Sequence, residues 1–188
     1  MADPAPTAGA PAGLPVVKRH RHLLVPITAA GASRERLEAY LGLVDRPLTA
    51  LLARERLRRD APGRFTYRSN PHRILQREVV PTLGLAARWE ANRLEVRSTR
   101  CQLVGLGSWG EAMGFTLAAS LAPREALLTG WAEVAIHSRM MSMGPAKGLA
   151  GLALESVLDR IERRLARGLH KDAVAWLEEA DDREAFRG

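Results

Sequence analysis

The stretch CQLVGLGSWGEAMGFTLAAS, residues 101–120, carries glycines at the spacing Gly105-x-Gly107-x-x-Gly110 directly after an apolar run. Glycines at this spacing let the backbone turn tightly and let a pyrophosphate approach the first turn of a helix. Further along the chain, Ser138 and Arg139 are the sort of pair that could hold a 2′-phosphate. These residues could therefore bind a dinucleotide, provided that a helix follows the glycines.

The words GLGSWGEAMGFTLAAS resemble the phosphate-binding loop of NADP-linked dehydrogenases, which implies one alternative function, an NADP-linked oxidoreductase. Three features count against it. The strand entering such a loop should be apolar throughout, but RLEVRSTRCQLV is charged at alternating positions. After Gly110, the alternation of Met113, Phe115 and Leu117 favours a strand over a helix. Only one helix is expected after Ser138, so the later parallel strands cannot be built.

Other signals of catalysis or metal binding are weak. The chain has neither an HExxH nor a GxSxG motif, and its single cysteine, Cys101, fits a small buried side chain in a strand. Arg97 and Arg100 would orient a ligand oxygen only if they faced inward, and strand arginines more often face solvent. The five histidines are scattered, at His20, His22, His72, His137 and His170. We therefore expect no catalytic residue, no metal and no cofactor, and binding rather than catalysis.

The net charge of +7 raises a second alternative, a basic adaptor for RNA or an anionic membrane. Nearly all of the basic residues are arginines, as a GC-rich genome would produce without any binding function. Near the C-terminus, a basic row of Arg160, Arg164, Arg167 and Lys171 follows one side of an expected helix, while Glu155, Asp159 and Glu162 follow the other side. A solvated helix surface explains both sides without a partner, so no stable nucleic-acid complex is expected, and a transient membrane-surface contact is left open.

Composition divides the chain into one domain and two tails. Residues 1–19 are rich in Ala, Pro and Gly and are expected to form a disordered tail, residues 20–180 a single domain, and residues 181–188 a C-terminal tail. The single cysteine excludes an internal disulfide, and no apolar run reaches the roughly 18 residues of a membrane span. We expect a cytoplasmic protein, with no prediction of its oligomeric state.

The order of elements follows from periodicity. A strand is expected at 22–28, and two short helices follow, at 34–44 after the capping residue Ser33 and from Pro47 onward. Period-two segments with turn signals then run to about residue 138, which is typical of an antiparallel meander of about seven strands. A long helix at 145–179 carries one apolar stripe, in which Asp172 is the odd member. Asp172 should either bond a neighbouring strand or lie near the exposed helix end.

This order resembles the helix-grip α+β fold of START domains, polyketide cyclases and Bet v 1-like proteins (the SRPBCC group). More specifically, the chain resembles an uncharacterised family of cyanobacteria and plastid-bearing plants. The segments that carry this resemblance are Tyr40-Leu41 with Pro47, RFTYR at 64–68, PTLGLAARWE at 81–90, LEVRSTRCQLVG at 94–105, LLTGWAEVAI at 127–136, and the helix ALESVLDRIERRLARGLHKDAVAWL. The resemblance covers about residues 20–178 and implies a curved sheet around the long helix with a mainly apolar cavity between them. It implies no particular reaction.

A curved sheet gripping an apolar helix stripe suits a hydrophobic small molecule, such as a lipid, a quinone, an isoprenoid or a pigment. The expected lining is Leu85, Ala87, Trp89, Val96, Ser98, Phe115, Leu117, Val134, Ile136, Leu154, Leu158, Ile161 and Leu165. Each of these residues could equally fill a solid core. The methionines of MMSMG at 140–144 would adapt to a ligand at the cavity mouth, or simply pack at the start of the helix.

Overall fold

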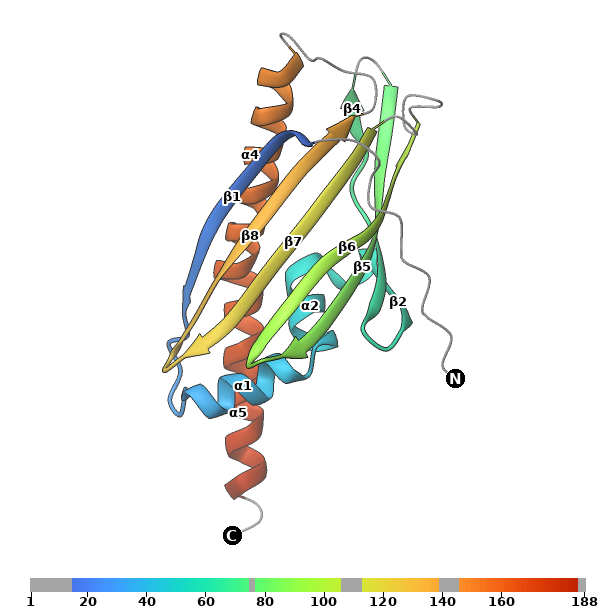
Figure 1. Cartoon of the computed structure of the whole chain (residues 1–188). Helices are drawn as coiled ribbons and strands as arrows, with labels where there is room; N and C mark the ends of the chain where they lie inside the picture. The colour runs from blue at the N-terminus through green and yellow to red at the C-terminus, as the bar shows by residue number, and fades with distance from the viewer. Residues whose placement is uncertain (1–14, 75–76, 106–112, 139–145, 186–188) are drawn as a thin grey trace, which may run out of the picture.

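The computed structural model describes residues 15–74, 77–105, 113–138 and 146–185. Within them, one curved antiparallel sheet wraps around a long C-terminal helix, and two short helices lie at one end of the sheet (Figure 1). The strands are β1 (Pro15–Pro26), β2 (Leu57–Ala61), β3 (Arg64–Arg68), β4 (His72–Ile74), β5 (Arg77–Glu90), β6 (Arg93–Val104), β7 (Met113–Arg124) and β8 (Leu127–Ser138). The helical segments are α1 (Arg34–Gly42), α2 (Asp45–Leu52), the 3₁₀ turn η1 (Arg54–Arg56), α4 (Ala146–Arg164), the π-helical turn η2 (Leu165–Leu169) and α5 (His170–Ala185).

The strands are arranged in the order β1-β8-β7-β6-β5-β3-β2, with β4 paired to β5. The first strand therefore lies beside the last, and every paired neighbour is antiparallel. Ala91 and Asn92 connect β5 to β6 with φ values of 49° and 58°, the positive values that suit the twist of a two-residue hairpin. This arrangement confirms the helix-grip α+β fold predicted from the sequence.

Local signals explain the two short helices. Ser33 caps α1, because its hydroxyl accepts a hydrogen bond from the backbone N–H of Arg36 at 3.3 Å. The second helix starts at Asp45 rather than at the predicted Pro47. Pro47 still lies in the first helical turn, where a missing N–H removes no intrahelical bond. Leu37, Leu41 and Leu48 are buried against the rest of the core.

The long C-terminal helix contains an irregularity that keeps one side buried. Four residues at successive spacings of four are all buried: Leu165, Leu169, Ala173 and Leu177. In a regular α-helix of 3.6 residues per turn, side chains at this spacing would gradually rotate away from one face. The π-helical turn η2 lies within this run and adds residues to one turn, which offsets the rotation. Gly168 in this turn lies against α2, because a Cβ there would be 2.6 Å from the carbonyl oxygen of Ala50.

Three strands extend further than the sequence predicted. The first strand begins at Pro15, because β8 offers partners along its whole length and Val17 is buried opposite Ile136. Prolines 81 and 123 lie inside β5 and β7 rather than between strands. Pro81 falls between the ends of the β3 and β4 pairings, and Pro123 lies beyond the last pair with β6. A proline nitrogen has no hydrogen to donate, so Pro81 interrupts no pairing with β3 or β4, and Pro123 interrupts none with β6.

Candidate functional site

The inner face of the sheet is built by alternation along four neighbouring strands. Leu85 pairs with Ser98, and Ala87 with Val96, so β5 and β6 present these predicted residues to one face. After Ser98, Thr99 has no register partner in β5, and Cys101 then takes the inward position opposite Leu83. The bulge therefore reverses the alternation of β6, which strict period-two reading cannot show.

The predicted lining residues fall into two burial classes. The buried residues are Leu85, Ala87, Val96, Val134, Leu154, Leu158 and Leu165. The half-buried residues are Trp89, Ser98, Phe115, Leu117, Ile136 and Ile161. All of them except Ser98 belong to one apolar cluster between the sheet and the helices. The fold therefore gathers these apolar side chains in one region.

Burial changes along this face from one end to the other. Leu94, Leu121 and Leu128 are at most 3 % exposed at the end covered by α1, α2 and α5, which we call the closed end. Toward the start of β7 and the end of β8, Phe115, Leu117 and Ile136 are only half-buried. This second region, together with Cys101 of β6, is called the open end below. Figure 1 shows that α4 runs past this end, while α1 and α5 lie at the other.

Strands β6 and β7 are joined differently at the two ends. Their register runs from Leu94 opposite Leu121 to Arg97 opposite Ala118 and stops there. Beyond that point, the side-chain oxygen of Ser98 accepts a hydrogen bond of 2.9 Å from the backbone N–H of Leu117.

Burial raises the pKa of the Cys101 thiol, against the opposing effect of the Phe115 backbone N–H. Cys101 is therefore a small, mainly neutral side chain in this gap, and not an activated nucleophile.

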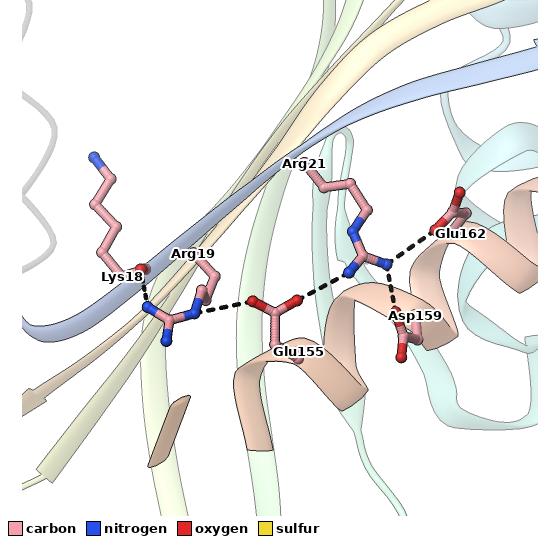
Figure 2. Close-up of polar contacts among 6 residues, drawn as sticks. All are labelled: Lys18, Arg19, Arg21, Glu155, Asp159 and Glu162. Atoms are coloured by element: carbon pink, nitrogen blue, oxygen red, sulfur yellow. Dashed lines mark hydrogen bonds and ion pairs between the residues drawn. The ribbon is translucent and has the colours of Figure 1, made fainter. Parts of the chain in front are cut away.

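Charged side chains join β1 to α4 at the edge of the same face. Figure 2 shows Glu155 between Arg19 and Arg21, with N to O distances of 2.9 Å to each. Arg21 also contacts Asp159 and lies 2.9 Å from Glu162. The hydrogen bond from Arg21 to Asp159 is the main cause that raises the pKa of this guanidinium. We call these five residues the β1–α4 latch.

Sequence reasoning missed the latch. It assigned Glu155, Asp159 and Glu162 to a solvated helix surface, whereas they bind two arginines of a strand far away in the chain. A signal was present in KRHRHLLV, because Arg19 and Arg21 share the alternation of the buried Leu23. Arginines on an inward-facing register require carboxylate partners.

A second polar network fixes α5 to the short helices. The Tyr40 hydroxyl donates to a carboxylate oxygen of Asp172 at 2.9 Å, and Arg46 Nε donates to the same oxygen at 3.1 Å. The two terminal nitrogens of Arg46 bind Glu179 at 2.9 and 3.2 Å. Burial, and then the charge of Asp172, raises the pKa of Tyr40. Asp172 is thus bonded to neighbouring helices and not to a strand, and we call this network the α5 clamp.

The glycine motif has a structural role in the described residues. Gly105 has a φ of 106°, and a Cβ there would collide with the backbone oxygen of Glu78 in β5. Residues 113–124 form the strand β7 in an antiparallel sheet, so the helix required by the dinucleotide hypothesis is absent from this segment. That hypothesis is wrong. Gly107, Gly110, Arg139 and the methionines at 140–144 lie outside the described residues.

The remaining candidates do not join the site. Arg97 and Arg100 are exposed, and Arg100 donates to the hydroxyl of Thr66 at 3.2 Å. No cluster of three or more His, Cys, Asp or Glu side chains that could hold a metal ion occurs among the described residues. Within the same residues, no helix combines the length and apolar character needed to cross a membrane.

Comparison with known proteins finds neither a matching family model nor a matching curated protein. Similar solved structures include a Thermus thermophilus protein, at 12 % identity over 85 % of this chain and 98 % of that one, with a TM-score of 0.47. The Zhui aromatase/cyclase of Streptomyces sp. R1128 has 11 % identity over 84 % and 94 % of the two chains, with a TM-score of 0.47. A START superfamily protein of Mycobacterium smegmatis has 14 % identity over 78 % and 95 %, with a TM-score of 0.41. At these identities the function has to be argued from the residues of this chain.

Proposed function

We propose that this protein binds a hydrophobic small molecule between the sheet and the C-terminal helix, at the open end. The observation that supports the proposal is the gradient of burial along a single apolar face. Phe115, Leu117 and Ile136 retain exposed surface in the same cluster whose other end is sealed by Leu121 and Leu128. Apolar surface left exposed beside a packed core marks a place where a ligand can complete the core.

The chemistry of this face selects the class of ligand. A ligand that covers the exposed parts of Phe115, Leu117 and Ile136 would gain a binding free energy of about 25 cal/mol for each Å² of apolar surface removed from water. Of the described polar groups near this face, Ser98 accepts a hydrogen bond from Leu117, and the latch arginines bind carboxylates. An apolar molecule such as a lipid, a quinone, an isoprenoid or a pigment fits these surroundings better than an anion. Retention of such a ligand requires no catalysed step.

We further propose that the predicted set lines the site, with its half-buried members on β6, β7 and β8 in contact with the ligand and its buried members forming the floor. Trp89 pairs with Leu94 and therefore belongs to the closed end of this lining. Leu154 and Leu158 of α4 then lie at the level of Leu117, because Glu155 binds Arg19 and both Arg19 and Leu117 pair with Val134 of β8. Ile161 and Leu165 follow toward the closed end. Membership in the cyanobacterial and plastid family, and a cytoplasmic location, remain predictions from the sequence.

The test is native mass spectrometry of the purified protein, combined with organic extraction and identification of any bound lipid. We expect a mass shift that disappears on extraction, and a raised melting temperature when the extracted molecule is added back, because a ligand that binds only the folded state stabilises it. The proposal would be contradicted if the purified protein carries no bound molecule and its melting temperature does not change on addition of quinones, isoprenoids, pigments or fatty acids.

A pair of variants locates the binding site. Leu117→Trp places a large side chain on the inner face of β7, whereas Ala118→Trp places the same side chain on the outer face of the same strand. We expect the first variant to lose most of the bound ligand while its circular dichroism spectrum is retained. The second variant should bind like the wild type. Equal retention by both would exclude the open end as the site.

A further inference from the structure

Charges on the C-terminal helix are divided between an inner and an outer side. The acidic residues of α4 with described side chains, Glu155, Asp159 and Glu162, all bind arginines of β1. The next acidic residue along the chain, Asp172, binds Arg46 and Tyr40. The carboxylates of this stretch are therefore neutralised from within the protein, by cations that belong to other elements.

The basic row of Arg160, Arg164, Arg167 and Lys171 has the opposite environment. Arg160, Arg167 and Lys171 are exposed, and Arg164 is half-buried. Among the described residues, the ion pairs involve none of these four side chains. The latch and the α5 clamp thus engage the acids that would otherwise compensate the row, and within the part of the chain that the structure describes its four cations form no ion pair.

The shape of this surface favours a flat anionic partner. At a rise of 1.5 Å per residue, the row extends for about 17 Å along the helix axis. Gly168, which follows Arg167 in the chain, lies against Ala50 of α2. The next two residues of α2, Leu51 and Leu52, pack partly against the core and remain half-buried. Arginines with adjacent partly exposed leucines match the headgroup and acyl boundary of a bilayer.

Single-stranded RNA fits this surface less well. Proteins that bind it usually add aromatic side chains on which bases stack. Residues 157–172 and 45–56, which form the helix with the basic row and the adjacent helix, contain no Phe, Tyr or Trp. We propose that the basic row with Leu51 and Leu52 docks this protein on the surface of an anionic lipid bilayer. This docking is independent of whether a ligand occupies the open end.

The test is co-sedimentation of the full chain with phosphatidylcholine vesicles that contain or lack phosphatidylserine. We expect binding only to the vesicles with phosphatidylserine, weakened by added salt, because the attraction is electrostatic. The variant Arg160→Glu, Arg164→Glu and Arg167→Glu should lower the partition coefficient by roughly 100-fold or more, since each arginine removed costs several-fold and each glutamate adds repulsion.

A matched variant separates the position of the charges from their number. Arg64→Glu, Arg93→Glu and Arg124→Glu change the net charge equally, at exposed positions of β3, β6 and β7 that take part in none of the described ion pairs. We expect this variant to stay within about threefold of the wild type. Equal losses in both variants, no binding to anionic vesicles, or binding of the basic row to RNA while vesicles are ignored would each overturn the proposal.

Discussion

The two halves of the C-terminal helix both bury leucines, but they differ in their polar contacts. In α4, Leu154 and Leu158 are fully buried, and the polar contacts to β1 are made by the latch, whose carboxylates are 42 to 58 % exposed. In α5, Ala173 and Leu177 are fully buried, and the clamp attaches Asp172 to Tyr40, whose ring is also buried. Exposed ion pairs contribute little and are screened by salt, whereas buried apolar contacts contribute most of the stability.

This difference assigns separate roles to the two ends. The closed end, with α1, α2 and α5, contains many of the fully buried side chains, and Leu154 and Leu158 of α4 add to them. The open end, with α4, gives up part of that packing at Phe115, Leu117 and Ile136. Regions that bind ligands tend to have low local stability. A protein that is stabilised mainly at one end can therefore have a less tightly packed second end.

The largest expected effect tests where stability resides. Leu169→Ala removes a fully buried side chain at the π-helical turn and should lower the free energy of unfolding by about 2–5 kcal/mol, because it leaves a cavity. Leu117→Ala, at the open end, should cost about 1 kcal/mol, since the side chain is only half-buried. Urea denaturation of both variants provides the measurement. Equal losses would remove the distinction between the two ends.

The α5 clamp should give the next largest effect. Tyr40→Phe removes the hydroxyl that donates to Asp172 but keeps the ring beside Trp176. We expect a loss of about 1–3 kcal/mol in urea denaturation, because a partly buried carboxylate loses a donor. Thr66→Val, which removes an exposed hydroxyl that donates to Asp60, is the control and should cost less than the clamp variant. A loss no greater than that of the control would show that the clamp does not stabilise the closed end.

The same tyrosine predicts an alkaline limit to stability. The pKa of Tyr40 is raised in the folded protein, so the folded state keeps a proton that the unfolded state releases above about pH 10. The unfolding free energy should therefore fall above that pH by about 1.4 kcal/mol per pH unit. In a Tyr67→Phe variant, phenolate absorbance reports Tyr40 alone, and it should rise only as the protein unfolds. Ionisation of Tyr40 before unfolding would contradict this account.

The latch should give the smallest change in stability. Arg21→Met removes contacts to Glu155, Asp159 and Glu162, and should cost less than about 1 kcal/mol in urea denaturation because these carboxylates are largely exposed. The wild type should lose a similar amount when salt is added, and the variant should lose less. A loss as large as that of Leu169→Ala would mean that the latch contributes as much to stability as a fully buried leucine, against this account.

The periodic parts of the molecule could be predicted from the sequence. Alternation placed Leu85, Ala87 and Val96 on one face, and the helical stripe placed Leu154 and Leu158 opposite them. The strand after the glycines was expected from Met113, Phe115 and Leu117, and β7 confirms it. These patterns are local, so one sequence was sufficient.

Contacts between distant segments could not be predicted in the same way. The latch joins Arg21 to residues more than a hundred positions later, and the clamp joins Tyr40 to Asp172 over 132 positions. The bulge at Thr99 depends on the register with β5, which no period shows. The gradient from buried to half-buried apolar residues depends on where α1 and α5 end on the sheet, so the open end became visible only in three dimensions.

The most direct test of the central claim is photocrosslinking with a fatty acid that carries a diazirine near the end of its chain. Peptide mapping by mass spectrometry then reports which residues contact the chain. We predict that labels concentrate on residues 113–117 of β7 and 154–158 of α4, and that unlabelled fatty acid reduces this labelling by competition. Labels that gather on the outer face of the sheet, or on α1 and α2 at the closed end, would contradict the account.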